Sequence, residues 1–422
     1  MKFETTERFV VFLFPADLRR KKTQINADKG GTDKISEVLR IFLRENCMPC
    51  TLTLIISDFI GGNLWEIKKK KIDFQLSLTS TIPKPALSAL KHPTSEIEKP
   101  MKPSLILLFF LLSTSLFAQE SWTTITPKTE ATPRHENSFV ECEGKLYSLG
   151  GRGERPVEEY DSKTNTWTKL DDAPMEIHHF QAISYQGEIW VVGALTGKYP
   201  HETPIPNALI FNPKTKTWRD GPKLPENRLR GSAGVFVRNN KIYLVCGIQD
   251  GHFDGFVRWF DELDPKTGTW KSLPSAPRAR DHVSAALVGD RLYLAGGRTS
   301  YAKIGKVLEL TNNEIDYFDF KTNTWTTIEA EIPTPRAGNS NLGIGPYLVI
   351  LNGESQAQTP AHAEVEVLDT RTHTWSKLPN LNQGRHGTGA AFLDGKIWVQ
   401  AGSANRGGGP EISTMEVLEW RK

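Results

Sequence analysis

The stretch "DSKTNTWTKL", which begins at Asp161, occurs five times in this chain with small changes. The other copies are "NPKTKTWRDG" from Asn212, "DPKTGTWKSL" from Asp264, "DFKTNTWTTI" from Asp319 and "DTRTHTWSKL" from Asp369. In every copy a Trp stands six positions after the Asp or Asn: Trp167, Trp218, Trp270, Trp325 and Trp375. A phrase that returns about every 50 residues predicts a repeat architecture, in which each copy marks one supersecondary unit.

A second unit recurs between these phrases, and it occurs six times: "GKLYSLGG", "GEIWVVGA", "NKIYLVCG", "DRLYLAGG", "PYLVILNG" and "GKIWVQAG". Its first small or polar marker residues are Gly150, Gly193, Cys246, Gly296, Asn352 and Ala401. Sixteen residues before these markers lie what we call the start positions: Arg134, Ile177, Arg230, Arg280, Arg336 and Arg385. The chain therefore contains six units, and Ile177 alone departs from Arg.

Each unit contains an apolar strand after the start position, an alternating strand that ends at the marker pair, a strand that ends with an acid, and the Trp strand. Four antiparallel strands per period of about 50 residues predict one blade of a β-propeller. The sequence therefore predicts an all-β, six-bladed propeller, with the large Trp rings buried between neighbouring blades.

The sixth blade lacks its Trp phrase at the C-terminus, where "MEVLEWRK" ends the chain. Trp122 lies twelve residues before Arg134, which matches the spacing between the other Trp residues and the next start position. We therefore expect the strand at Trp122 to pair with residues 413–420 and to close the ring. This assigns residues 119–422 to the propeller.

A hydrophobic leader precedes the repeats, in "MKPSLILLFFLLSTSLFAQE" from Met101. Its apolar run at 105–112 is too short to cross a bilayer as a helix, and Lys102 before it and Ala118 after it are typical of a signal peptide. We predict a signal peptide at 101–118, a secreted or periplasmic protein, and no stable membrane span after cleavage. Residues 1–100 would then be an upstream extension that is not native or is disordered. The alternative is an N-terminal domain tethered by a transmembrane segment.

The charge and the cysteines narrow the function classes. Residues 1–118 hold 18 Lys and Arg against 12 Asp and Glu, which leaves a slightly acidic propeller without a nucleic-acid footprint. The pair Cys47 and Cys50 has redox or metal spacing, but it lies in the upstream extension and has no second pair. Cys142 and Cys246 lie in different repeats, and we expect no structural disulfide.

The start positions and the residues after the marker pairs should lie on one rim, because alternate connections of a four-stranded meander share a face. Five Arg in equivalent places could ring a channel mouth with positive charge and bind carboxylates or sugar hydroxyls. They could equally belong to the framework and pair within the blades. The candidate ligand-binding residues are Arg134, His135, Glu136, Arg152, His178, His179, Arg230, Arg280, His282, Arg298, Arg336, Arg385 and His386. Asp281 lies on the same segments. The histidines come from different blades, and we expect no metal site.

The marker pair, the Tyr or Phe followed by an acid, and the late Trp resemble the kelch-repeat signature over nearly all of residues 119–422. The resemblance implies that Arg at a blade start can contact acidic ligands. It also extends to exported, cofactor-free N-acetylneuraminate epimerases with six blades, and implies Glu354 of "LNGES" as their acid. Galactose oxidase-like kelch enzymes need a copper site of His, Tyr and crosslinked Cys, which this sequence does not offer.

Three functions remain open at this stage. The first is a monomeric propeller that binds a small molecule or glycan, anionic in character, at the Arg-bearing rim without a cofactor. The second is a cofactor-free sugar epimerase or mutarotase that uses Glu354 with a His or Arg. The third is a protein-interaction scaffold, and the fold alone does not choose among the three. The varied loops at 195–209, 248–259, 298–313 and 354–364, and the sector of Ile177, are where we expect specificity.

Overall fold

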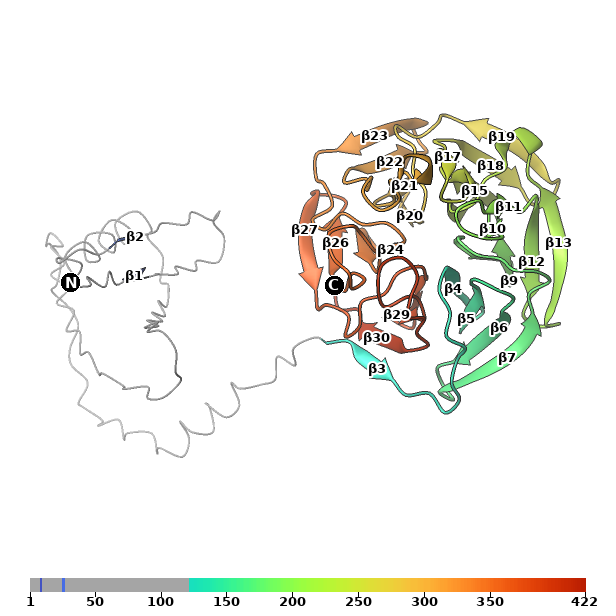
Figure 1. Ribbon diagram of the computed structural model, residues 1–422, viewed down its shortest axis with the longest axis horizontal. Helices are drawn as coiled ribbons and strands as arrows, with labels where there is room; N and C mark the ends of the chain where they lie inside the picture. Colours follow the sequence, from blue (N-terminus) through green and yellow to red (C-terminus); the bar gives the residue numbers. More distant parts are fainter. Residues whose placement is uncertain (1–7, 10–24, 27–120) are drawn as a thin grey trace, which may run out of the picture. The chain divides into compact units, whose positions relative to one another are not determined.

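The computed structural model describes residues 8–9, 25–26 and 121–422 of the chain. The two short stretches are β1 (Arg8–Phe9) and β2 (Ile25–Asn26), which pair antiparallel. Residues 121–422 contain six four-stranded antiparallel sheets arranged around a central axis (Figure 1). This confirms the predicted six-bladed, all-β propeller. The expected signal peptide at 101–118 lies outside the described residues.

The first three blades follow one another along the chain. Blade one comprises β4 (Asn137–Cys142), β5 (Lys145–Gly150), β6 (Pro156–Asp161) and β7 (Thr166–Asp172). Blade two comprises β8 (Ile183–Tyr185), β9 (Glu188–Val191), β12 (Asn207–Asn212) and β13 (Thr217–Lys223). Blade three comprises β14 (Gly234–Arg238), β15 (Lys241–Val245), β18 (Phe260–Asp264) and β19 (Thr269–Leu273).

The other three blades complete the circle. Blade four comprises β20 (Ala285–Val288), β21 (Arg291–Leu294), β22 (Ile315–Asp319) and β23 (Thr324–Ile328). Blade five comprises β24 (Ser340–Ile344), β25 (Tyr347–Leu351), β26 (Val365–Asp369) and β27 (Thr374–Leu378). Blade six comprises β28 (Ala390–Leu393), β29 (Lys396–Gln400), β30 (Met415–Glu419) and β3 (Thr123–Ile125).

Blade six is built from both ends of the propeller. Thr123, Thr124 and Ile125 of β3 pair antiparallel with Val417, Glu416 and Met415 of β30. Trp122, which precedes β3, is buried, and its indole N–H donates to the carbonyl of Pro379 at 2.9 Å. The outermost strand of the last blade therefore comes from the segment just before the first blade.

The repeated Asp phrase is a turn between the third and fourth strands of a blade. Asp161 Oδ1 accepts from the backbone N–H of Lys163 at 2.9 Å, and Asn165 takes a left-handed conformation with φ of 55°. The other four copies repeat the contact at 2.9–3.0 Å. A short acidic or amide side chain that bonds two residues ahead stabilises such a turn, which explains why only Asp or Asn opens the phrase.

The Trp that follows this turn packs between two blades. Six hydrophobic clusters lie at the six blade-to-blade interfaces, and each contains the Trp of one blade against the inner strands of its neighbour. The Trp residues in question are Trp122, Trp167, Trp218, Trp270, Trp325 and Trp375. Trp122 and Trp167 are buried and the other four are half-buried, so these rings add apolar contact to interfaces that the buried side chains of the inner strands also fill.

The marker pairs also join neighbouring blades. In blade four, the N–H of Gly297 donates to the carbonyl of Arg336 in blade five at 3.0 Å, and blades one, three, five and six repeat this bond. A Cβ at Gly296 would lie 2.7 Å from the same carbonyl, and Gly296 has a φ of 77°. A side chain would therefore both clash and strain the backbone at this strand end.

Two hairpins and one 3₁₀ turn lie in the loops after second strands, and another 3₁₀ turn lies between two blades. The hairpins are β10 (Leu195–Thr196) with β11 (Thr203–Pro204), and β16 (Ile248–Asp250) with β17 (Asp254–Phe256). The turns are η1 (Glu226–Arg228), in the connection from blade two to blade three, and η2 (Ala302–Ile304), in the blade-four loop. Three of these elements fall in the varied loops that the sequence picks out.

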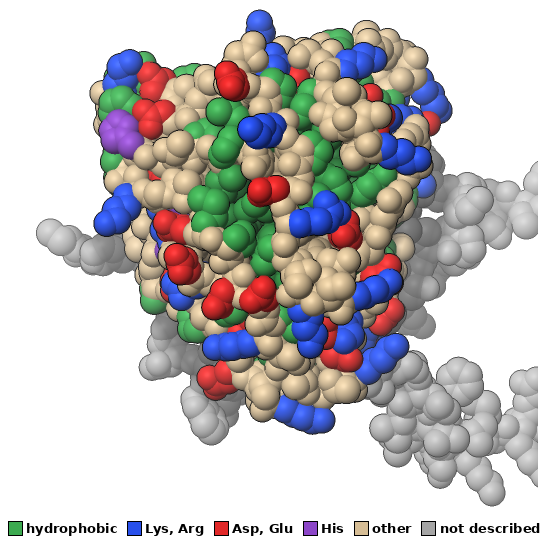
Figure 2. All heavy atoms as spheres, turned by 90° about the vertical axis from the view of Figure 1, so that its right-hand side faces the viewer, with side chains coloured by type: hydrophobic (Ala, Val, Ile, Leu, Met, Phe, Trp, Pro, Cys, Tyr) green, Lys and Arg blue, Asp and Glu red, His purple; other side chains and the backbone are tan. Residues whose placement is uncertain are grey.

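The side of the propeller over β13 carries basic and acidic side chains that are interspersed, with hydrophobic side chains between them (Figure 2). Such a mixed surface differs from the one-signed patch that nucleic-acid binding uses. Cys142 and Cys246 are buried and free, which confirms that they form no disulfide. Among the residues that the structure describes, none lies in a helix long and apolar enough to cross a bilayer.

Candidate functional site

A ring of six equivalent residues surrounds one end of the central channel. Each lies two positions after a start position, and we call the set the mouth ring: Glu136, His179, Ser232, His282, Gly338 and Gly387. All six have left-handed φ angles, from 48° to 63°. The channel beneath them has a volume of about 340 Å³ and is lined by the first strands of the blades.

Hydrogen bonds between successive blades hold the mouth ring closed. The N–H of His179 donates to the carbonyl of Glu136 at 3.0 Å, and the N–H of Ser232 donates to the carbonyl of His179 at 2.8 Å. His282 continues the circle through the Ser232 hydroxyl at 2.9 Å. Backbone bonds through Gly338 and Gly387 return the circle to blade one. Glu136, His179, Ser232 and His282 carry side chains in this strained conformation, and the hydrogen bonds of the whole ring support it.

The five Arg at the start positions do not face this channel. All five are fully buried, and each forms an ion pair with the acid of the third strand in its own blade. The pairs are Arg134–Glu158 at 2.6 Å, Arg230–Asp261 at 2.8 Å, Arg280–Asp316 at 2.7 Å, Arg336–Glu366 at 3.0 Å, and Arg385–Glu416.

The interpretation of these Arg as ligand contacts needs correction, and the framework alternative fits them. Each guanidinium also donates to backbone carbonyls within its blade, as Arg280 does to the carbonyl of Gly296 at 2.6 Å. Burial lowers the pKa of Arg230 to about 10, against the opposing effect of Asp261. A guanidinium without exposed surface, whose partners all lie in one blade, has no face to offer a ligand.

Blade two replaces this ion pair by an apolar pair. Ile177 takes the place of the Arg, and Leu209 occupies the strand position that carries the acid in the other blades. Both side chains are buried in the cluster between blades one and two. Blade two thus replaces both the Arg and its acid, by Ile177 and Leu209. Ile177 by itself therefore does not indicate a site of ligand specificity.

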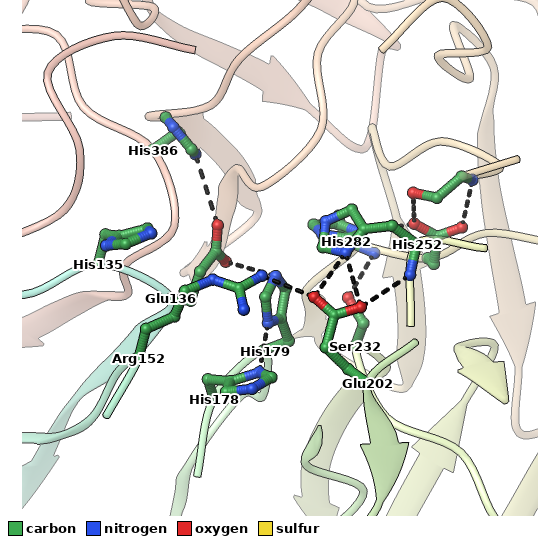
Figure 3. A network of polar contacts seen from close by, with 12 residues as sticks. His135, Glu136, Arg152, His178, His179, Glu202, Ser232, His252, His282 and His386 are labelled. Carbon is green, nitrogen blue, oxygen red and sulfur yellow. Dashed lines mark hydrogen bonds and ion pairs between the residues drawn. The ribbon is translucent and has the colours of Figure 1, made fainter. Parts of the chain in front are cut away.

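A histidine cluster lies at the mouth ring where blades two, three and four meet (Figure 3). His179 and His282 belong to the ring, and His252 comes from the hairpin turn between β16 and β17. The three ring centroids lie 4.7–5.1 Å apart, and all three side chains are buried. Burial lowers the pKa of His179 and His282 well below the ordinary value, so both imidazoles are neutral at neutral pH.

Acidic side chains hold the cluster from outside. Glu202 accepts from His252 Nδ1 at 2.9 Å and from Arg152 Nη2 at 2.7 Å. Burial would raise the pKa of Glu202, but His252 and Arg152 outweigh it and lower this pKa to about 2. Asp281 lies 2.5 Å from His282 Nδ1, and the Ser300 hydroxyl and N–H donate to its carboxylate.

Glu354 belongs to a buried pair with Arg298 on the same face. Arg298 Nη1 lies 2.5 Å from Glu354 Oε1, and the N–H of Gly407 donates to Oε2 at 2.7 Å. Burial would raise the pKa of Glu354, but His386, 3.4 Å away, and Arg298 lower this pKa to about 2. A carboxylate that stays ionised in this way is a poor general acid, which weighs against the epimerase role implied for Glu354.

The structure thus brings most of the predicted rim residues together, apart from the five Arg. Arg152 reaches into the histidine network from blade one and keeps about a quarter of its side chain exposed, at 25%. His135 lies apart from the cluster and pairs with Glu411 at 2.8 Å, and Glu411 also binds Arg155. Sequence reasoning missed His252 and Glu202, because both lie in varied loops without a repeat position. The only signal for them was a His and a Glu in loops of neighbouring blades.

Comparisons with known proteins agree with this architecture. Residues 221–402 match the family described as "KLHDC2/KLHL20/DRC7 Kelch-repeats domain". The chain is a kelch-repeat β-propeller. Kelch-like protein terF of Aspergillus terreus is 26% identical over 290 residues, which are 64% of this chain and 61% of that protein. Alpha-scruin of Limulus polyphemus is 29% identical over 56% of this chain and 26% of its own length.

The chain spans less than two thirds of the length of these curated relatives. The solved structure of YjhT superposes on this kelch propeller with a TM-score of 0.58 and covers 69% of this chain and 96% of its own. At 16% sequence identity this likeness shows the fold alone. The function must therefore be argued from the mouth of this propeller.

Proposed function

We propose that this kelch propeller binds a small acidic carbohydrate at its channel mouth, through Arg152 and Tyr199. The observation that carries the proposal is the placement of Tyr199 beside the histidine cluster. Tyr199 is 57% exposed, and its ring centroid lies 5.2 Å from that of buried His252. An exposed aromatic ring next to a polar, partly enclosed mouth is a common arrangement in small-molecule sites.

The chemistry around Tyr199 suits a sugar acid. A sugar ring has an apolar face that can pack on the Tyr199 ring, and hydroxyls that can bond the imidazoles and acids behind it. Arg152 Nη2 donates to Glu202, and the other N–H groups of Arg152 can pair with a ligand carboxylate in a charge-assisted hydrogen bond. This retains the anionic ligand expected from the sequence but moves its recognition from the start-position Arg to Arg152.

The hydrophobic segment at 101–118 supports an exported protein in this proposal. Export would place the propeller where free glycans and glycoconjugates occur. Detection of a mature N-terminus near Gln119 by mass spectrometry of the secreted protein tests this part separately from ligand binding.

The binding test is isothermal titration of the purified protein with N-acetylneuraminate, glucuronate and galacturonate, and with glucose as the neutral control. We expect at least one sugar acid to bind, and Arg152→Ala to weaken it by about 10-fold or more, as for loss of a charge-assisted bond. Tyr199→Ala should also weaken it. Arg371→Ala is the matched control, because Arg371 is exposed on a turn of blade five. If the sugar acids bind no better than glucose, or if Arg152→Ala binds them normally, the proposal is wrong. The result would then favour the protein-interaction scaffold.

A further inference from the structure

The hydrogen bonds around the histidine cluster indicate which ring nitrogens carry protons. The proton positions of His179 follow from its neighbour His178. His178 Nε2 lies 3.1 Å from the carbonyl of Gly197, so it must donate to this acceptor. In a neutral imidazole the other nitrogen then accepts, so His178 Nδ1 accepts from His179 Nδ1 at 2.6 Å. His179 Nε2 is thereby left with its lone pair. It makes no hydrogen bond, although Glu136 Oε2 lies 3.2 Å away.

The same reasoning applies to His252 and His282. His252 Nδ1 donates to Glu202, whose carboxylate only accepts. Burial raises the pKa of Asp281, but the Ser300 hydroxyl and N–H donate to Asp281 and Arg298 lies 4.0 Å away, and these contacts favour the carboxylate. His282 Nδ1 therefore donates to Asp281. The Nε2 atoms of His252 and His282 lie 3.1 Å apart, and each presents a lone pair. A proton could bridge these two nitrogens only by making a buried imidazole cationic, which desolvation opposes. Three unprotonated nitrogens from three blades therefore face one another.

We propose that His179, His252 and His282 bind a divalent first-row transition-metal ion, such as Zn²⁺, through their Nε2 atoms. One ligand nitrogen of each histidine lies within 4.8 Å of the other two. Bonds of about 2.0–2.1 Å from zinc to nitrogen would draw the three imidazoles together by roughly 1 Å. Three protein ligands leave a fourth position for water or a ligand oxygen, as in catalytic zinc sites. This departs from the metal-free expectation drawn from the sequence.

The surroundings have the features that accompany metal-binding histidines. Metal ligands of this type usually donate their second ring nitrogen to a carboxylate, as His252 does to Glu202 and His282 to Asp281. The charges of the buried network also favour a cation. Its four acids outnumber its two arginines and leave two negative charges: Glu136, Glu202, Asp281 and Glu354 against Arg152 and Arg298.

The site stands independently of the proposed carbohydrate ligand, because it rests on the histidine geometry alone. The test is isothermal titration of the full chain, without a polyhistidine tag, with ZnCl₂ and CoCl₂. The protein titrated should carry both Cys47→Ser and Cys50→Ser, because two cysteines at CxxC spacing can also bind zinc. We expect one ion per chain for zinc and cobalt, and no comparable binding of Mg²⁺, which prefers oxygen ligands.

Single variants locate the ion. His252→Ala and His282→Ala should each lower zinc affinity by more than the 10–100-fold typical of outer-shell changes. His373→Ala is the matched control, because His373 is exposed on a turn in blade five, and it should bind normally. His252→Ala removes a buried side chain that bonds Glu202, so circular dichroism of this variant without metal checks that it keeps the fold of the parent.

Glu202→Gln tests the positioning of His252. It should weaken zinc about 10–100-fold while the absorption spectrum of bound cobalt stays that of a nitrogen and oxygen site. Absence of stoichiometric binding, or unchanged affinity in both His252→Ala and His282→Ala, would overturn the metal site.

Discussion

At the residue scale, the start positions show how a repeated charge can serve the fold rather than a ligand. Five blades bury an Arg with an acid of the same blade, and blade two buries Ile177 with Leu209 instead. Both solutions fill the same place between the first and third strands. Buried ion pairs can be replaced by apolar pairs of similar volume at little cost, whereas removing one partner leaves a buried charge.

This contrast gives a prediction for blade four. Arg280→Ala should lower the free energy of unfolding by about 3 kcal/mol, because buried Asp316 loses its buried partner and keeps only the half-buried Arg278, at 2.7 Å. The double change Arg280→Ile with Asp316→Leu, which copies blade two, should recover most of this loss. Guanidinium unfolding curves of the parent, the single variant and the double variant measure both effects. A single variant as stable as the parent would show that the ion pair is not a framework element.

At the element scale, the structure of each blade could largely be predicted from the sequence. The turn phrase fixes the link between third and fourth strands through the Asp carboxylate, and the Trp six residues later lies in the next cluster. Strand parity also placed the start positions at the correct end of the blade. It could not decide whether Arg134 faces the channel or its own third strand, because the repeat pattern shows an acid at the position of Glu158 but not which way the Arg side chain turns.

The joining of the chain ends in blade six predicts a large effect at one residue. Trp122 is 4% exposed, packs in the cluster between blades five and six, and bonds the carbonyl of Pro379. Trp122→Ala should therefore lower the free energy of unfolding by roughly 3–5 kcal/mol. Thermal unfolding followed by near-ultraviolet circular dichroism, which reports aromatic packing, is the measurement. A loss below about 1 kcal/mol would mean that β3 adds little to the ring.

At the scale of the whole molecule, the propeller gathers at one channel end groups that are far apart in the sequence. The mouth ring could be predicted in part, since His179 and His282 follow start positions, but His252 and Glu202 lie in varied loops. His252 and Glu202 reach the mouth ring because of how the loops with hairpins β10–β11 and β16–β17 pack. These loops do not repeat from blade to blade, so the repeat pattern could not predict their packing. We therefore propose that the channel mouth is the binding surface of this kelch propeller.

The measurement that tests this claim most directly is X-ray diffraction from crystals grown with the sugar acid that binds best in titration. We expect electron density for the sugar between Tyr199 and Arg152, with its carboxylate on the Arg152 guanidinium. Density on the opposite end of the channel or on the outer edges of the blades, with the mouth unchanged, would contradict it.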